Sequence, residues 1–289
     1  MNKEGTIRVI RADGRSDRLG ATLMSVVRTA PQTATVGLRV AIRELQADFR
    51  ENKLGFLWLF ITPLMYVAAF VAIRNGLESR GLSTTDGPVP GAVFALAGLI
   101  VFQTWFDSAL TQLTVFSKNQ SLIKNIGIEP ETFLYAGIAK SLALAAPKLL
   151  LLCGAMALMR VETFSWASYP GYVVVLVAAC LSGSMTGYLL SPFGAVMNDV
   201  KMALQSASLA LLLGSAVFFD ADTFSGGWAH VAFGLNPIAC IVDAARFVLF
   251  GGPFTLKGYA AGWLAASAAL LPFSMVFTRL SRRIVAERL

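Results

Sequence analysis

Histidine and cysteine are scarce in this sequence: its 289 residues include one histidine and three cysteines. The single histidine, His230, cannot form a histidine-ligated metal centre or an obvious catalytic triad. Cys153, Cys180 and Cys240 have no paired spacing, so they predict neither a disulfide framework nor a zinc site. An enzyme is therefore not expected, and no metal or cofactor is expected on this chain.

Charged residues are also scarce, at 14% of the chain, against about 25% in an average soluble domain. Hydrophobic residues make up 56%, and several uncharged windows approach the roughly 20 residues that a helix needs to cross a bilayer. This composition predicts an all-α integral membrane protein. The six predicted spans are 54–73, 87–106, 141–159, a segment within 163–198, 202–219 and 258–278.

A seventh apolar stretch, residues 223–242, is not predicted to cross the membrane. Ten of the 24 lysines and arginines precede Leu54 and four follow Phe277, which predicts that both termini lie in the cytoplasm. Two termini on one side require an even number of crossings. Glycines and the Asn236-Pro237 pair also interrupt the stretch, so we expect re-entrant helices in an outer region, 220–257.

Nucleic acids and nucleotides are not expected to bind this chain. The net charge of +7 is explained by topology, because cytoplasmic loops carry excess lysine and arginine and face anionic lipid. Residues 135–141, "YAGIAKS", lack the glycines of a phosphate-binding loop and lead into a predicted span instead of following a strand. ATP is therefore not expected to bind to this chain through that segment.

The polar N-terminal region changes its pattern near residue 35. Residues 1–33 mix polar and charged residues without apolar periodicity, which predicts a mobile cytoplasmic tail before a membrane domain at 34–289. Within residues 35–50, apolar side chains recur at helical intervals, and arginines lie elsewhere around the helix. The apolar residues are Leu38, Ile42, Leu45 and Phe49. This pattern predicts an amphipathic helix at the membrane interface, and a solvated helix packed on its own domain is the alternative.

Three ionisable residues, Asp107, Lys140 and Lys148, lie within or beside the predicted spans. Charges in hydrocarbon are costly, which makes them functional candidates. Lys140 is expected to extend to the cytoplasmic interface, and Asp107 is consistent with an interfacial position. Lys148 lies deeper, and the sequence leaves open whether it faces a transport path.

Aromatic residues make up 11% of the chain, and four of the five tryptophans lie near predicted membrane boundaries, where an aromatic belt is expected. Aromatic faces also offer flat apolar platforms for the C–H surfaces of sugars and for cations. The candidates for a substrate path are Trp105, Phe106, Phe60, Tyr66 and Lys148.

Two short motifs predict local structure. Gly183 and Gly187 form a Gly-x-x-x-Gly face for close helix packing, and its partner is either in the same chain or in a second copy. Asn236-Pro237 predicts a helix start, with the asparagine as N-cap and the proline at the first helical position. Asp243 and Arg246 lie three residues apart on that helix, where they can pair. Asn236, Pro237, Asp243 and Arg246 are candidates for an outer gate, although the charged pair has the alternative role of mutual neutralisation.

Four segments occur in a recognisable order: "RELQADFRENKLGFLWLFITPL", "GLIVFQTWFDSAL", "NQSLIKNIGIEPETFLY" and "LNPIACIVDAARFVLFGG". Over residues 35–280 the chain resembles the permease subunit of the ABC type-2 polysaccharide exporters, which include capsule, O-antigen and teichoic-acid exporters. The first segment resembles the capsular branch most closely. The chain departs from the family pattern at Asn198-Asp199 and Ser215-Ala216.

The resemblance implies a homodimer in the bacterial inner membrane with two copies of a cytoplasmic ATP-binding subunit, which would hold the ATP and Mg. It also implies a coupling segment at 117–131 flanked by the interface helix, and re-entrant outer helices between spans five and six. The residues implied in ATPase coupling are Lys118, Lys124, Glu129, Pro130, Glu131, Arg43 and Arg50.

The expected function is ATP-driven export of a lipid-linked polysaccharide, with glycolipid and membrane lipids as further partners and periplasmic export proteins as optional ones. A related permease that exports a small lipid or drug is one alternative. The others are a membrane-embedded glycosyl- or acyltransferase and a nonenzymatic assembly scaffold. The sugar composition and the lipid anchor do not follow from the sequence.

Overall fold

The computed structural model describes residues 19–51, 54–78, 89–119, 130–159, 166–220 and 227–288, and within these ranges it is helical without strands. The helices are α1 (Leu19–Glu51), α2 (Gly55–Glu78), α3 (Gly91–Leu113), α4 (Val115–Lys118), α6 (Pro130–Leu158), the 3₁₀ helix η1 (Trp166–Ser168), α7 (Tyr169–Val196), α8 (Asn198–Ser206), α9 (Ser208–Leu213), α10 (Gly227–Leu235), α11 (Pro237–Phe250) and α12 (Lys257–Arg288). The predicted all-α fold is confirmed for this part of the chain.

Four of the described helical segments are long and apolar enough to cross a membrane. They are Gly55–Gly76, Gly91–Leu113, Pro130–Leu158 and Trp166–Val196. They overlap the first four predicted spans, which supports a multi-pass membrane protein. The fifth predicted span, 202–219, is divided between α8 and α9 by Ala207, and the sixth lies within α12. These two spans stay predictions.

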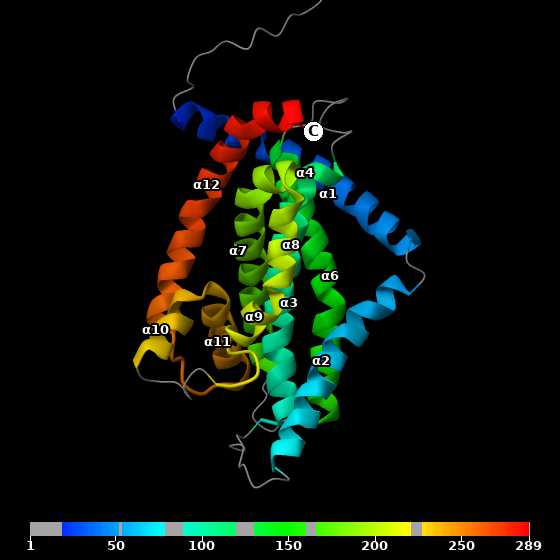
Figure 1. The fold of residues 1–289 in the computed structure, drawn as a ribbon, viewed down its shortest axis with the longest axis vertical. Helices are drawn as coiled ribbons and strands as arrows, with labels where there is room; N and C mark the ends of the chain where they lie inside the picture. The colour runs from blue at the N-terminus through cyan, green and yellow to red at the C-terminus, as the bar shows by residue number, and fades with distance from the viewer. Residues whose placement is uncertain are drawn as a thin grey trace, which may run out of the picture.

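The two ends of the described chain lie at the same end of the helical bundle (Figure 1). In that view α1, α4 and the end of α12 are at the top, whereas α10 and α11 lie beside the lower half of the bundle. This arrangement agrees with an even number of crossings.

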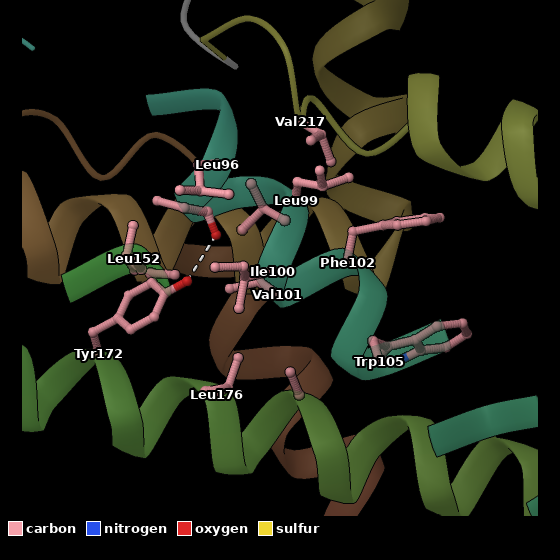
Figure 2. Packing of buried hydrophobic residues seen from close by; sticks show 14 of the residues in the cluster. Leu96, Leu99, Ile100, Val101, Phe102, Trp105, Leu152, Tyr172, Leu176 and Val217 are labelled. Carbon is pink, nitrogen blue, oxygen red and sulfur yellow. Dashed lines mark hydrogen bonds between the residues drawn. The ribbon is translucent and has the colours of Figure 1, made fainter. Parts of the chain in front are cut away.

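The core forms around α3, which packs against α6, α7 and α11. Figure 2 shows this packing, in which Tyr172 of α7 points at α3 and donates a hydrogen bond to the carbonyl oxygen of Ala97 at 2.8 Å. Both Tyr172 and Leu99 are fully buried. The polar end of the tyrosine is thus satisfied by a backbone group inside an apolar core.

The Gly-x-x-x-Gly motif packs inside the chain. A Cβ added at Gly183 would overlap the carbonyl oxygen of Trp105, and one at Gly187 would overlap that of Ala109. Both contacts are with α3, so the partner helix of this motif is in the same chain. The absence of side chains here lets the two backbones approach closely.

Helix α1 begins at Leu19, whereas a mobile tail was predicted up to residue 33 and a helix from residue 35. Its Gly37, Val40 and Ala41 pack on α6, and a Cβ at Gly37 would lie 2.7 Å from the carbonyl oxygen of Thr132. Of the apolar residues that were expected to define the membrane face, Leu38, Ile42 and Phe49 are exposed, and Leu45 is partly buried. Thus α1 packs on its own chain through small residues and leaves its predicted apolar stripe uncovered.

The helix start at Asn236-Pro237 is confirmed. The Asn236 side chain accepts a hydrogen bond from the backbone N–H of Ile238 at 3.0 Å, and Pro237 begins α11. The two short helices expected in the outer region are present as α10 and α11. Their re-entrant position in a membrane stays a prediction.

Candidate functional site

A cavity of about 330 Å³ lies between α2, α3, α6 and α9. Its walls combine aromatic rings with a small set of polar groups. The aromatic residues are Trp58, Tyr66, Phe102 and Phe106, and the polar ones are Thr62, Gln103, Asp107, Lys148 and Ser208. Concave, mostly apolar sites with a few polar groups are typical ligand sites.

An ion pair between α3 and α6 lies in the cavity wall, where the Lys148 ammonium is 2.7 Å from the Asp107 carboxylate. Only 5% of the Lys148 side chain is exposed, against 46% for Asp107. The buried Lys148 ammonium would be an uncompensated buried charge without the Asp107 carboxylate, whereas the carboxylate is half exposed. Lys148 thus lies in a cavity wall, and its role as a path residue stays a prediction.

The other predicted path residues do not all reach this cavity. Tyr66 and Phe106 line it. Phe60 packs edge-on against Phe56, with 5.3 Å between ring centroids. Trp105 is buried and donates from Nε1 to the hydroxyl of Ser182 at 3.4 Å. The structure thus places three of the five predicted residues together, and Trp105 belongs to the contact between α3 and α7.

The cavity can offer a sugar the groups that carbohydrate recognition uses. Aromatic faces pack against C–H surfaces, and carboxylate or amide oxygens accept hydrogen bonds from hydroxyls. The Gln103 Oε1 atom is buried and accepts no hydrogen bond from the described residues. Among those residues, no group of three His, Cys, Asp or Glu side chains lies close enough to hold a metal ion.

Five of the seven predicted coupling residues are among the described residues, and they belong to α1, α4 and the start of α6. Arg43 and Arg50 are exposed on α1, and Lys118 is exposed at the end of α4. Pro130 and Glu131 are buried at the start of α6, so they contribute to packing there. Lys124 and Glu129 lie outside the described residues.

Lys140, which was expected to extend to the cytoplasmic interface, has partners on α1. Its Nζ lies 3.2 Å from Glu44 and 2.7 Å from Asp48, and the Asn119 amide donates to Glu44 at 2.9 Å. These four residues, Glu44, Asp48, Asn119 and Lys140, are named the polar node. It joins α1 to α6 and to the end of α4.

The predicted outer-gate residues anchor a turn. The Asn236 amide donates to the carbonyl oxygen of Gly214 at 2.8 Å, and Arg246 donates to the carbonyl oxygens of Ala216, Val217 and Phe219. Asp243 accepts from the backbone N–H of Leu256 at 2.8 Å. Asn236 and Arg246 therefore hold the chain after α9, and Arg246, whose guanidinium lies 3.6 Å from the Phe94 ring centroid, ties this turn to α3.

Several residues of the cavity wall and of the polar node were not among the predicted site residues. Asp107 was given an interfacial position, and Glu44, Asp48 and Asn119 had no assigned role. Opposite charges in two separate apolar runs, such as Asp107 and Lys148, are a usable signal because intramembrane charges pair with one another. Gln103 and Thr62 carry no comparable signal in the sequence.

Curated proteins similar to this chain are known, although no family model matches it. The chain is 20% identical to the polysialic acid transport protein KpsM of Escherichia coli over 226 residues, 78% of this chain and 84% of the relative. It is 20% identical to the O-antigen export system permease protein RfbA of Myxococcus xanthus over 79% of this chain and 85% of that one. It is also 20% identical to the capsule polysaccharide export inner-membrane protein CtrC of Neisseria meningitidis, over 68% and 64%. The predicted resemblance to the permeases of ABC type-2 polysaccharide exporters is therefore confirmed over most of the chain.

Proposed function

We propose that this chain is the transmembrane subunit of an ATP-driven exporter that moves a lipid-linked polysaccharide across the bacterial inner membrane. The relatives support this function, since their names describe polysialic acid transport, O-antigen export and capsule polysaccharide export. The four candidate spans provide the membrane scaffold that it requires.

The observation that carries the proposal is the cavity between α2, α3, α6 and α9. Its aromatic residues, Trp58, Tyr66 and Phe106, offer platforms for sugar rings, and the Asp107–Lys148 pair offers both an acceptor and a donor to hydroxyls. A long polymer cannot be enclosed whole, so we propose that such contacts lie along a continuous path and hold one part of the glycan at a time.

In the proposed assembly, two copies of this chain form a dimer with two copies of an ATP-binding subunit. The chain crosses the membrane six times with both termini in the cytoplasm, and α10 and α11 are the re-entrant outer helices. The ATP-binding subunit contacts the exposed faces of α1 and α4, where Arg43, Arg50 and Lys118 lie. ATP and Mg bind to that subunit and supply the energy.

Capsular polysaccharide is the proposed cargo, with O-antigen as the alternative. Two of the relatives named above are capsule or polysialic acid transporters, and the third is an O-antigen export permease. All three relatives are 20% identical to this chain, so identity does not distinguish the two cargoes. The capsular branch is favoured because residues 43–64 of this chain resemble its motif.

Aromatic substitutions test the role of the cavity. In proteoliposomes that contain this chain and its ATP-binding subunit, Trp58→Ala and Tyr66→Ala should each lower the ATP-dependent movement of lipid-linked polysaccharide. Each stacked ring is worth about 1 kcal/mol, which corresponds to a several-fold change. Trp228→Ala is the matched control, because Trp228 is 83% exposed and does not line the cavity. Equal rates for all three variants and the native chain would contradict the cavity as a substrate site.

A further inference from the structure

The polar node joins three helices at a single buried ammonium. Lys140 of α6 is paired with Glu44 and Asp48, which lie one turn apart on α1. Glu44 also accepts a hydrogen bond from Asn119, the C-cap of α4. Because 5% of the Lys140 side chain is exposed, water cannot readily replace these carboxylates. Separation of α1 from α6 would leave a buried charge without its partners.

A second contact strengthens this connection. Gly37 of α1 packs against the backbone of Thr132 and Ala136 at the start of α6, where an added Cβ would lie 2.7 Å from the Thr132 carbonyl oxygen. Thus α1 meets α6 through small residues at Gly37 and through ion pairs at Lys140. Two attachment points oppose sliding and rotation of α1 on α6 more than one would.

The node is close in sequence to exposed basic residues and, along α6, to the cavity. Arg43 of α1 and Lys118 of α4 directly precede the node residues Glu44 and Asn119, and both are exposed. On α6, Lys140 and the cavity residue Lys148 are about two helical turns apart. A force applied to α1 and α4 therefore reaches α6 through Lys140, and α6 carries one half of the Asp107–Lys148 pair.

We infer that Lys140 is a positioning residue that makes α1, α4 and α6 move as one body when the ATP-binding partner acts on α1 and α4. The inference rests on the proposed function for the existence of that partner, and it does not depend on the cargo. None of the four node residues lines the cavity. It transmits motion by holding the three helices in one geometry.

The test uses the complex of the full chain with its co-purified ATP-binding subunit. Spin labels at Gln46→Cys on α1 and Ser117→Cys on α4, both exposed positions, report the distance between these helices with and without bound ATP. Labelled chain is diluted with unlabelled chain, so that each complex reports the pair of labels in one copy, and the native chain should then give one narrow distance distribution in both states. Lys140→Met should broaden it, and Lys140→Arg should restore it because the ion pairs are kept.

Transport per ATP hydrolysed is the second readout. Lys140→Met should lower it about tenfold, the scale of a typical coupling between two sites, while co-purification of the partner stays unchanged. Lys257→Met is the matched control, since Lys257 is an exposed lysine at the start of α12, outside the node and outside α1 and α4. Narrow distances and native transport per ATP in Lys140→Met would overturn the inference.

Variants of the carboxylates keep the test decisive if Lys140→Met fails to fold. Asp48→Asn removes one ion pair from a half-exposed side chain, and it should broaden the distance distribution in the same direction. A native distribution in Asp48→Asn and in Glu44→Gln would also overturn the inference. A native complex that keeps its distances but moves no polysaccharide would contradict the proposed cargo alone, whereas the lack of any co-purifying ATP-binding subunit would contradict both.

Discussion

The Lys148 ammonium and the Asp107 carboxylate lie 2.7 Å apart, and this pair joins α6 to α3 in the wall of the cavity. The two residues are unequal, because the lysine side chain is buried and the aspartate side chain is half exposed. The cost of losing each partner should therefore be unequal as well.

Asp107→Asn should destabilise the protein more than Lys148→Met does. The first change leaves a buried ammonium without its carboxylate, at a cost of about 3 kcal/mol, the lower end of the range for a broken buried pair. Lys148→Met leaves the Asp107 carboxylate without its lysine, but this side chain is 46% exposed and is therefore not a buried charge. Thermal unfolding in detergent measures both, and the double variant should recover part of the loss. Equal decreases in unfolding temperature for the two single variants would contradict the unequal burial of Lys148 and Asp107.

Gly187→Ala should destabilise the packing of α7 on α3. The new methyl group would overlap the carbonyl oxygen of Ala109, and such overpacking costs about 1–3 kcal/mol. Gly154→Ala is the matched control, because its Cβ would meet nothing within 4 Å and alanine is the better helix former. A lower unfolding temperature for Gly187→Ala, with an equal or higher one for Gly154→Ala, is the expected result. Equal changes in unfolding temperature for the two variants would contradict the close contact between Gly187 and the backbone of Ala109.

Two substitutions of Asn236 separate its two roles. Asn236→Asp keeps the oxygen that caps Ile238 but loses the amide that donates to Gly214. Asn236→Ala loses both, and a lost N-cap costs about 1 kcal/mol. The free energy of unfolding should therefore fall in the order native, aspartate, alanine. An alanine variant as stable as the native chain would show that neither contact matters.

Local patterns predicted local structure better than they predicted contacts between helices. The start of α11 followed from Asn236-Pro237, because an N-cap depends on neighbouring residues. Gly183 indicated close packing, but its partner, Trp105 of α3, is distant in sequence and carries no matching motif. Hydrophobicity predicted the membrane-facing stripe of α1 but not the face that packs on the protein, since Gly37 and Ala41 contact α6 through their small size while Leu38 is exposed.

The candidate site was predicted in part for the same reason. Tyr66, Phe106 and Lys148 were expected along a path and do line one cavity. Trp105 was expected there because tryptophan suits sugar contacts, yet its ring packs against α7 near Ser182. Aromatic residues in a membrane protein serve belts, cores and binding sites alike, and only the orientation of the helix decides among these roles.

Membrane topology gives a further prediction. A reporter fused after Arg288 should be active in the cytoplasm, whereas one fused after Gly76 or after Gly252 should be active outside it. The reason is that six proposed crossings would return the chain to its starting side, with residues 223–242 predicted to turn back without crossing. A reporter after Arg288 that is active in the periplasm would require an odd number of crossings. The C-terminal end would then lie on the side of the membrane opposite to the ATP-binding subunit.

Transport by the reconstituted complex tests the central claim most directly. The chain and its co-purified ATP-binding subunit are placed in liposomes with lipid-linked capsular polysaccharide, and the glycan that becomes accessible on the far side is measured. The account predicts movement that needs ATP and both proteins and that falls in Trp58→Ala. Hydrolysis of ATP that responds to small hydrophobic compounds, without movement of any lipid-linked polysaccharide, would contradict it.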